Sequence, residues 1–220
     1  MNKDEKPDFW NDPSTVVYFE DKPADPRIVR RLATYLKSRT EGATLRGLDL
    51  GCGGGRHTEL LHDLGFEVYA CDVNPAMLEA TRRRVPEAAH RVTYGSIQEI
   101  AYPDAFFDVV ITTGVLHQAE SREEYARAIQ EISRITKAGG LCLMNIFTNR
   151  TVDPALTLVG DAEPLYRTNE DLLMTLLSSD EASSLFYSSG FELEPGSEEA
   201  DKVEPTGIRT VFRAIYKKHS

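Results

Sequence analysis

The sequence lacks any hydrophobic run long enough to cross a membrane. No apolar stretch in its 220 residues approaches the roughly 18 residues that a transmembrane helix needs. The opening residues lead into Pro, Asp and Asn and not into the apolar segment of a signal peptide. We therefore expect a soluble, cytoplasmic protein without a membrane partner.

Cysteine is scarce, which excludes a disulfide framework. Cys52, Cys71 and Cys142 are odd in number, far apart and placed in apolar or glycine-rich segments, so we expect free, buried thiols in a reducing compartment. A nucleophilic thiol at Cys52 is the weaker alternative, because this residue closes an expected buried strand. The cysteines and histidines do not stand at metal-ligand spacing, and we expect no metal.

Basic residues are outnumbered by acidic ones. The chain has 25 Lys and Arg against 35 Asp and Glu, a formal net charge of −10. Such a surface repels phosphate backbones, and the basic cluster at residues 82–84 fits the solvated last turn of a helix. We expect no nucleic-acid partner, a small metabolite as the leading substrate class with protein side chains second, and a monomer or homodimer.

Strand-like and helix-like segments alternate at the spacing of βαβ units. This pattern predicts an α/β fold, a doubly wound sheet of seven mostly parallel strands with helices on both faces. The length and the hydrophobic content of 41% suit one domain, residues 27–220, preceded by a polar extension, residues 1–26.

The expected strands cover residues 46–52, 67–72, 92–95, 107–113, 141–147, 191–193 and 207–216. The expected helices cover residues 27–38, 58–64, 75–84, 121–136, 170–177 and 180–188. Asn74 and Pro75 begin one of these helices, and Gly139 and Gly140 end another. Residues 148–166 have no clear pattern, and loops of this length are often functional.

The segment GLDLGCGGGR carries the most informative pattern. A D-x-G-x-G-x-G motif, formed by Asp49, Gly51, Gly53 and Gly55, begins where a short apolar run ends. Because glycine adopts positive φ and leaves backbone amides bare, the turn suits a small-molecule ligand. A dinucleotide fingerprint would have a small residue where this chain has Arg56, and Asp49 is unfavourable near a diphosphate but favourable near an ammonium. The motif therefore argues against NAD or FAD.

A second acid ends the next expected strand. Asp72 closes the apolar run YACD about 20 residues after Gly51, the spacing of the ribose-binding acid in nucleotide folds. A carboxylate there can accept bonds from both ribose hydroxyls. The alternative role, a cap of the following helix, is already supplied by Asn74. Val73 and Met77 are candidates for packing on the adenine, although core packing explains Met77 equally well.

These segments resemble the class I S-adenosylmethionine (SAM) dependent methyltransferases, well over residues 27–147 and loosely beyond them. The resemblance implies a Rossmann-like sheet whose last strand runs antiparallel beside the fifth, SAM as the cofactor and S-adenosylhomocysteine as the product. It assigns the methionyl ammonium to Asp49. The cofactor-binding turn comprises Gly51, Cys52, Gly53, Gly55 and Arg56.

The run YGSI, after the third expected strand, departs from the family pattern. Family members usually have an acid there that accepts a bond from the adenine amino group, whereas this chain has Ser96, a weaker neutral acceptor. Recognition of the ring by the backbone N–H of Ile97 survives the change. Gln98 is a substitute acceptor, and an ordinary polar turn explains both polar residues.

The run TGVLHQ follows the fourth expected strand, at the sheet edge where open α/β sheets bind ligands. We expect Thr113 and Leu116 to line the cofactor and His117 to face the methyl-transfer cavity. An imidazole there can remove a proton from the attacking atom, and packing or cofactor lining is the alternative. His57, one residue into the helix after the glycine turn, is expected to be exposed or to cap that helix.

The N-terminal extension is rich in aromatic residues, among them Phe9, Trp10, Tyr18 and Phe19. It is either a flap packed on the domain edge or a lid over the site, since excluding water favours SAM chemistry and aromatic faces attract a sulfonium. The resemblance favours Tyr18 as an aromatic residue near the reacting methyl group.

Together the motifs predict an enzyme that transfers a methyl group from SAM to a nitrogen, oxygen or carbon atom of a small metabolite. Another SAM reaction on the same scaffold, such as an intramolecular cyclisation, stays open. A non-catalytic SAM-binding regulator also stays open, because a fold does not determine a function. An NAD-dependent oxidoreductase is disfavoured by Asp49 and Arg56.

Overall fold

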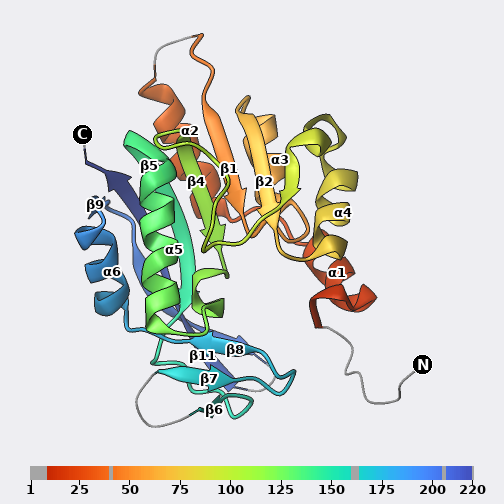
Figure 1. Ribbon diagram of the computed structural model, residues 1–220, viewed down its shortest axis with the longest axis vertical. Coiled ribbons are helices and arrows are strands. Elements are labelled where there is room, and N and C mark those ends of the chain that lie inside the picture. The colour runs from red at the N-terminus through yellow and green to blue at the C-terminus, as the bar shows by residue number, and fades with distance from the viewer. Residues whose placement is uncertain (1–8, 40–41, 160–163, 205–206, 220) are drawn as a thin grey trace. The chain divides into compact units, whose positions relative to one another are not determined.

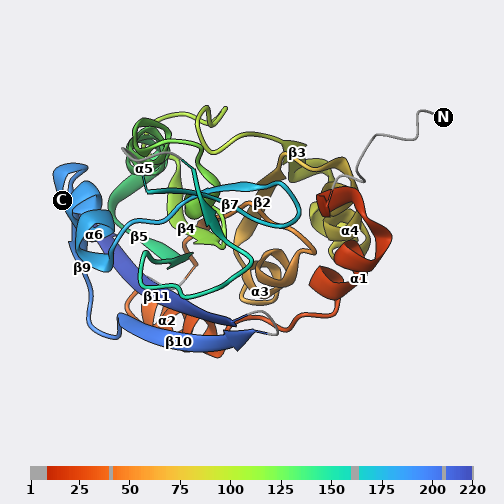
Figure 2. The ribbon, with the colours of Figure 1, turned by 90° about the horizontal axis from the view of Figure 1, so that it is seen from below.

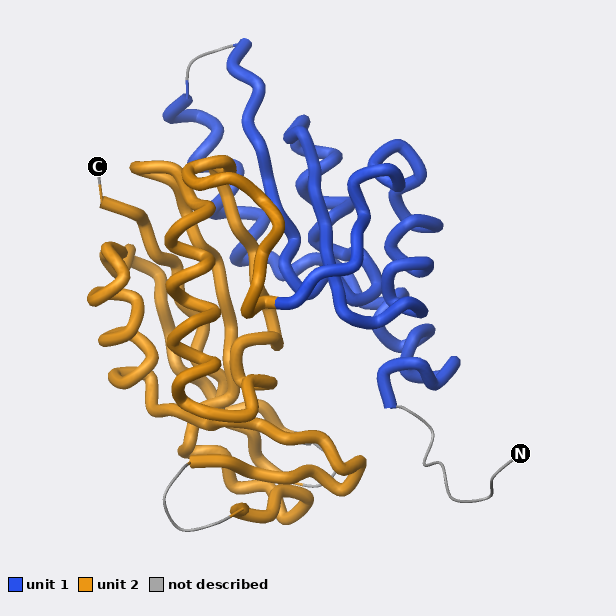
Figure 3. The backbone as a smooth tube through the Cα atoms, viewed as in Figure 1, with its two compact units in different colours: residues 1–96 blue, residues 97–220 orange. Residues whose placement is uncertain are grey.

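The computed structural model describes residues 9–39, 42–159, 164–204 and 207–219. The chain divides into two compact units, residues 1–96 and 97–220, coloured blue and orange in Figure 3. Each unit has its own strands and helices. The division predicted from the sequence, an extension followed by one domain, stays a prediction.

The first unit is built on a parallel sheet with the strand order β1, β2, β3. The strands are β1 (Arg46–Leu50), β2 (Glu67–Asp72) and β3 (Val92–Tyr94). The α-helices are α1 (Pro13–Glu20), α2 (Pro26–Lys37), α3 (Arg56–Asp63) and α4 (Pro75–Arg84), with 3-10 turns η1 (Phe9–Asn11) and η2 (Pro86–Arg91). Figure 1 shows β1 and β2 side by side, and Leu48 and Leu50 of β1 are fully buried.

Helices α1 and α2 begin with the same signal. Asp12 and Asp25 are the N-caps, and each is followed by a proline. The carboxylate of Asp12 accepts two backbone N–H bonds of its helix, and that of Asp25 accepts one. Helix α2 confirms the helix predicted from residue 27. Helix α1 lies in the extension, for which the sequence predicted only a flap or lid.

Helix α1 packs on α4 within the first unit. Val16 and Met77 are buried at this contact, with Phe19 partly buried against them. Arg84, at the end of α4, donates to the carbonyl of Glu20 at 2.7 Å. The solvated role predicted for residues 82–84 is therefore wrong for Arg84, because the extension covers its side chain.

The second unit contains the strands β4 (Phe107–Thr113), β5 (Thr136–Phe147), β9 (Phe191–Leu193), β10 (Glu198–Glu204) and β11 (Gly207–Lys218). Strands β4 and β5 are parallel, and β11 runs antiparallel to β5, which confirms the predicted last strand. Strands β9 and β10 both pair antiparallel with β11, and the sequence did not predict β10.

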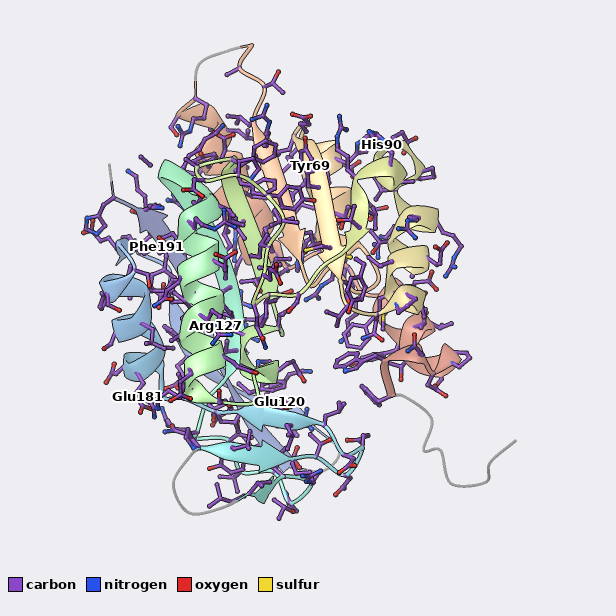
Figure 4. All side chains as sticks on the ribbon, viewed as in Figure 1. Tyr69, His90, Glu120, Arg127, Glu181 and Phe191 are labelled. Carbon is purple, nitrogen blue, oxygen red and sulfur yellow. The ribbon has the colours of Figure 1, made fainter. Side chains whose placement is uncertain are left out.

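Two helices lie side by side in the second unit, α5 (Arg122–Ile135) and α6 (Ser179–Ser188) (Figure 1). Arg122 of α5 pairs with Glu181, labelled at the start of α6 in Figure 4, at 2.8 Å. Ser178 caps α6 with a capping box completed by Glu181. Tyr216 of β11 stacks on Phe186 of α6 with ring centroids 4.0 Å apart, which fastens this helix to the sheet.

A second, antiparallel sheet follows β5 and consists of β6 (Thr157–Leu158), β7 (Leu165–Arg167) and β8 (Leu173–Thr175). Figure 1 labels its three strands, and Figure 2 shows β7 from below. The helix predicted for residues 170–177 is therefore wrong. The backbone N–H and the hydroxyl of Thr175 both donate to the carbonyl of Ala119, at 3.1 and 2.8 Å. This distant partner holds the segment extended, and a local apolar pattern does not contain it.

The glycine pair predicted to end α5 lies inside β5 instead. The helix stops at Ile135, and β5 starts at Thr136. Gly139 has φ +71°, and a Cβ on Gly140 would lie 3.0 Å from the carbonyl oxygen of Asp108. Gly139 thus serves the strand irregularity through its positive φ, and Gly140 through a close backbone approach, where the register between β4 and β5 shifts.

The α/β class predicted from the sequence is confirmed, with parallel strands in both units and one antiparallel strand beside β5. Within the described ranges, no helix is both long and apolar enough to cross a membrane.

Candidate functional site

The glycine turn leads from β1 into α3 in the first unit. Gly51, Gly53 and Gly55 have φ values of +73°, +52° and +79°, the left-handed region that favours glycine. The N–H groups of Gly51 and Cys52 donate to the carbonyl of Cys71 on β2, at 2.8 and 3.0 Å. The positive φ values expected for the motif are confirmed, and the turn is tied to the neighbouring strand.

Asp72 ends β2 and holds the glycine turn. Its Oδ2 accepts the N–H of Gly53 at 3.0 Å, and its Oδ1 accepts the N–H of Asn74 at 2.9 Å. Burial raises the pKa of the Asp72 carboxyl, and these backbone hydrogen bonds oppose the rise. Because a carboxylate oxygen accepts more than one hydrogen bond, both oxygens keep capacity for hydroxyls of a ligand.

Asn74 occupies the N-cap position of α4, but its side chain makes no capping bond. The sequence expectation that Asn74 supplies the cap is wrong for the side chain. The backbone of Asn74 is fixed by Asp72 instead, and Pro75 begins the helix.

Asp49 lies in β1 and is 1% exposed. Its Oδ2 accepts the hydroxyl of Thr58, from α3, at 2.7 Å. Burial raises the pKa of the Asp49 carboxyl to about 7, against the opposing hydrogen bonds from Thr58. This carboxyl titrates near neutral pH, and a cation beside it would favour its ionised form.

Thr81 of α4 supports the turn from the other side. Its hydroxyl donates to the carbonyl of Gly53 at 2.7 Å and lies 3.3 Å from the Cys52 sulfur. Cys52 packs with Ala70 and Leu78, and burial raises the pKa of its thiol well above the ordinary value. Packing, and not nucleophilic chemistry, therefore accounts for Cys52. Sequence reasoning missed both residues: Thr58 closely follows the motif but belongs to no part of its pattern, and Thr81 is far from it in the chain.

The N-terminal extension lies on the glycine turn. A Cβ on Gly54 would lie 2.5 Å from the backbone nitrogen of Glu20 and from the carbonyl carbon of Phe19, so only glycine allows this approach. Arg56 donates to the carbonyl of Pro23 at 3.4 Å, and burial lowers the pKa of its guanidinium. Tyr18 is 54% exposed.

The two residues expected near the adenine differ in exposure. Val73 is 49% exposed, whereas Met77 is 1% exposed and packs with Val16 and Ala80. Met77 belongs to the core between α1 and α4. Val73 remains open to a ligand.

The predicted site residues fall into two sets, because the division between units lies after Ser96. The first unit contains Tyr18, Asp49, Gly51, Cys52, Gly53, Gly55, Arg56, Asp72, Val73, Met77 and Ser96. The second unit contains Ile97, Thr113, Leu116 and His117. Within the second set, Thr113 ends β4, and Leu116 is fully buried in the 3-10 turn η3 (Leu116–Gln118).

His117 lies in η3 and is buried against Phe147, the last residue of β5. Its Nδ1 accepts the N–H of Phe147 at 3.3 Å, and the two rings lie 4.6 Å apart by their centroids. Burial lowers the pKa of His117 to about 3, with a further contribution from the positive charge of Arg209. A neutral imidazole that accepts at Nδ1 carries its proton on Nε2 and offers a donor there.

His57 is 2% exposed, so the exposed position predicted for it is wrong. Its Nε2 accepts the N–H of Asp25 at 3.4 Å, and burial lowers its pKa to about 3. The N-terminus of α2, which Asp25 caps, covers the imidazole. In this way His57 supports the start of α2.

Sequence reasoning missed a charged pair near His117. Arg209 of β11 donates from Nε to Oδ2 of Asp153 at 2.8 Å, and its guanidinium lies 5.1 Å from the ring centroid of Phe147. These residues are far apart in the chain and belong to no local motif. Among the residues that the structure describes, no group of three or more His, Cys, Asp or Glu side chains is placed to hold a metal ion.

Comparison with known families and proteins gives consistent matches. Residues 48–144 match the family model described as "Methyltransferase domain". A malonyl-[acyl-carrier protein] O-methyltransferase of Serratia marcescens is 33% identical over 98 residues, 44% of this chain and 36% of that protein. A probable S-adenosylmethionine-dependent methyltransferase of Mycolicibacterium smegmatis is 30% identical over 149 residues, 67% of this chain and 52% of that protein.

A tRNA (carboxymethyluridine(34)-5-O)-methyltransferase of Arabidopsis thaliana is 26% identical over 126 residues, 57% of this chain and 29% of that protein. The chain therefore spans at most about half the length of these relatives, with a share of 52% in the longest match.

Two solved structures show the same fold. The 1,6-didemethyltoxoflavin-N1-methyltransferase of Burkholderia thailandensis, with bound 1,6-didemethyltoxoflavin and S-adenosylhomocysteine, has a TM-score of 0.63 at 21% identity, over 97% of this chain and 82% of that chain. The [4+2]-cyclase SpnF has a TM-score of 0.58 at 19% identity, over 86% of this chain and 80% of that chain. The Rossmann-like methyltransferase fold predicted from the sequence is thereby confirmed.

Proposed function

Because this chain belongs to the class I SAM-dependent methyltransferases, we propose that it transfers a methyl group from SAM to a nitrogen, oxygen or carbon atom of a small metabolite. SAM is the cofactor of this family, and S-adenosylhomocysteine is the product that methyl transfer leaves. A cytoplasmic location, and a monomer or homodimer without nucleic acid or membrane as partner, are part of the same proposal.

The observation that carries the proposal is the contact between Asp72 and the glycine turn. The two carboxylate oxygens of Asp72 each accept one backbone N–H, from Gly53 and Asn74. Both oxygens keep acceptor capacity for the two ribose hydroxyls. The space beside Gly53 supports this role, since a Cβ there would meet only a ring carbon of Phe19, at 4.0 Å. The residues present therefore fit an adenosyl cofactor.

The other cofactor contacts follow from the same turn. Asp49 holds the methionyl ammonium, directly or through water, and the ammonium stabilises its ionised form. Val73 packs on the adenine with its exposed side chain, and Ser96 and Ile97 bind its edge. Gly51, Gly55, Arg56, Thr113 and Leu116 complete the cofactor site, while Met77 and Cys52 support it from the core.

The sulfonium supplies an activated methyl group, so the protein has to position the acceptor and exclude water. Holding the nucleophile about 3 to 3.5 Å from the methyl carbon lowers the barrier by several kcal/mol. His117 contributes a buried, neutral imidazole with Nδ1 bound to Phe147. We propose that it orients the acceptor through Nε2–H, and a base role would require the other tautomer. Tyr18 and the rest of α1 act as a lid.

A small metabolite is the acceptor class that the charge favours. The net charge of −10 opposes binding to a phosphate backbone. The toxoflavin-precursor methyltransferase has a small-molecule ligand bound, whereas the Arabidopsis relative acts on tRNA. The small-molecule class thus rests on charge and on one structural neighbour.

The experiment that tests the proposal uses purified protein, labelled SAM and a metabolite extract of the host. Methyl transfer produces S-adenosylhomocysteine together with a labelled product. Chromatography that instead finds methylthioadenosine would identify another SAM reaction. SAM binding without turnover of any extract fraction would favour the non-catalytic regulator.

The cyclase SpnF supports keeping a second candidate function, because it shares the fold. A cyclisation would leave SAM unconsumed while the acceptor changes its structure without change of mass. Mass spectrometry of the same reaction mixtures distinguishes this outcome from methylation.

A further inference from the structure

The charged pair beside His117 has donors that the fold does not use. Among the residues that the structure describes, the Arg209 side chain makes one hydrogen bond, from Nε to Asp153. Its two terminal amino groups have no hydrogen-bond or ion-pair partner among the described residues, and its side chain is 21% exposed. A guanidinium presents its remaining donors in a planar fork that matches the two oxygens of a carboxylate or phosphate.

The orientation of this guanidinium is fixed before any ligand binds. The Asp153 side chain is 0% exposed, and its Oδ1 accepts the N–H of Ala155 at 2.9 Å. The guanidinium carbon lies over the ring of Phe147. Because both anchors are buried or packed, Arg209 loses little freedom when it binds an anion.

The loop that carries Asp153 is fastened to β11 by its backbone. Val152 and Ile208 exchange two backbone hydrogen bonds of 2.8 Å. A Cβ on Gly207 would lie 2.6 Å from the carbonyl oxygen of Val152, so only glycine allows the loop to approach the strand this closely. The backbone therefore holds Arg209 and Asp153 next to each other at the edge of the sheet.

The pair also lies at the edge where this fold binds ligands. Arg209 stands at the start of β11, which runs antiparallel to β5, so it lies at the carboxyl end of β5. The ring of Phe147 contacts both the imidazole of His117 and the guanidinium of Arg209. An acceptor oriented by His117 thus has Arg209 within the same group of side chains.

We propose that Arg209 binds an oxyanion, a carboxylate or phosphate, of the methyl acceptor, and that Asp153 and Phe147 position it. This inference rests on the proposed function, since it assigns a chemical class to the acceptor. The alternative is that the pair only fastens the loop to β11. In that case an anion has no effect on Arg209.

The first test measures binding and needs no turnover. Protein saturated with S-adenosylhomocysteine is titrated with benzoate, with inorganic phosphate and with neutral benzamide, while NMR follows the arginine Nε–H signals. We expect benzoate or phosphate to shift the Arg209 signal and to compete with each other, and benzamide to leave it unchanged. The anion that shifts it at the lower concentration distinguishes carboxylate from phosphate. No shift with either anion would overturn the inference.

The second test measures turnover with anionic and non-anionic fractions of the host extract, separated on an anion exchanger. We expect the labelled product to come from the anionic fraction, and Arg209→Gln to lower kcat/KM by at least about thirtyfold while SAM affinity stays unchanged. Arg209→Lys should recover part of the loss, because it keeps the charge but not the fork.

Arg150→Gln is the matched control, since the Arg150 side chain is 67% exposed in its pair with Glu199 and the change should leave turnover unchanged. Product from the non-anionic fraction alone would overturn the inference while the proposed function stands. SAM binding without any product, together with an Arg209 signal that shifts with benzoate, would overturn the methyl-transfer function and leave Arg209 as an anion-binding residue of a ligand that is not methylated.

Discussion

The carboxyl edges of the two units hold their polar side chains in different ways. At the edge of β1 and β2, Asp72 bonds to backbone N–H groups of the glycine turn and of the residue before α4. At the edge of β4 and β5, Arg209 and His117 each contact the ring of Phe147. A loop residue, Asp153, accepts a hydrogen bond from Arg209. The first edge thus depends on local backbone geometry, and the second on side chains from distant segments.

This difference matches the two ligands that we propose. A cofactor shared by a whole family suits an edge made of backbone groups and one acid, because few substitutions preserve such a turn. An acceptor that differs between family members suits an edge made of separate side chains, because each can change without disturbing the backbone.

The largest effect is expected for Asp72→Ala. We expect SAM affinity, measured by calorimetry, to fall by about a hundredfold or more, because the variant loses the charged acceptors of the ribose hydroxyls. Asp72→Asn, which keeps the shape, is the matched variant and should retain part of the affinity. Unchanged affinity in an Asp72→Ala protein that still melts cooperatively would refute the ribose assignment.

Gly54→Ala tests whether the extension belongs to the first edge. The new Cβ would meet backbone atoms of Phe19 and Glu20 at 2.5 Å, so we expect α1 to separate from the turn at a cost of about 1–3 kcal/mol in unfolding free energy. Hydrogen exchange should rise in α1. Gly65→Ala is the control, because its Cβ meets no atom within 4 Å although φ is +81°. Equal hydrogen exchange of α1 in both variants would contradict the contact between the N-terminal extension and the glycine turn.

Asp49 should make SAM binding depend on pH. Its folded-state pKa of about 7 means that the carboxyl must lose a proton to hold the ammonium. We expect SAM affinity to fall by about tenfold per unit as pH drops below 7, and Asp49→Asn to flatten this dependence. A wild-type affinity that is flat between pH 5 and about 8 would exclude Asp49 as the ammonium partner.

Stability of the ligand-free protein runs in the opposite direction. The folded pKa of Asp49 is raised above the ordinary value of 3.8, so its contribution to stability is present at low pH and is lost as pH rises toward 7. Denaturant unfolding at several pH values, compared with Asp49→Asn, measures this contribution.

The smallest effect is expected for His117→Gln. The Gln amide keeps an N–H donor at the position of Nε2–H, so we expect kcat at neutral pH to fall by less than about tenfold, against roughly 100-fold or more for loss of a general base. The pH profile of kcat/KM should show no ionisation of this residue near pH 6.5. A larger loss, rescued at high pH, would identify His117 as a base.

His117 also affects acid stability. Its pKa is lowered in the folded state from 6.5 to about 3, so the stability present above pH 6.5 is lost as pH falls toward 3. We expect His117→Gln to reduce this loss. Equal acid sensitivity of both proteins, measured by denaturant unfolding, would contradict the burial of a neutral imidazole.

Sequence patterns were sufficient for the core of the fold. The predicted limits of β2, α4 and β4 agree with the structure, because each has a clear apolar pattern and a cap, proline or glycine at its ends. Patterns failed for residues 170–177, where the carbonyl of Ala119 holds β8 extended. They also failed at Gly139, which serves a strand irregularity and not a helix end.

In the candidate site, too, local patterns predicted some features and missed those that depend on tertiary contacts. The spacing of Asp49, the glycines and Asp72 indicated a turn with positive φ beside an acid, because short-range sterics and hydrogen bonding determine such turns. Thr58 and Thr81 support this turn from helices, and no local pattern marks them. The burial of His57 and His117, which determines their protonation, also has no local signature.

By itself, the sequence determined the α/β fold, the glycine turn and the acid that faces it, since these depend on periodicity and on the conformational freedom of glycine. Only the tertiary structure decided that Asp49 titrates near pH 7, that His117 stays neutral, and that Arg209 meets Asp153 and Phe147. The reason is physical: burial and the pairing of distant side chains arise from packing, which brings together residues whose separation along the chain carries no signal.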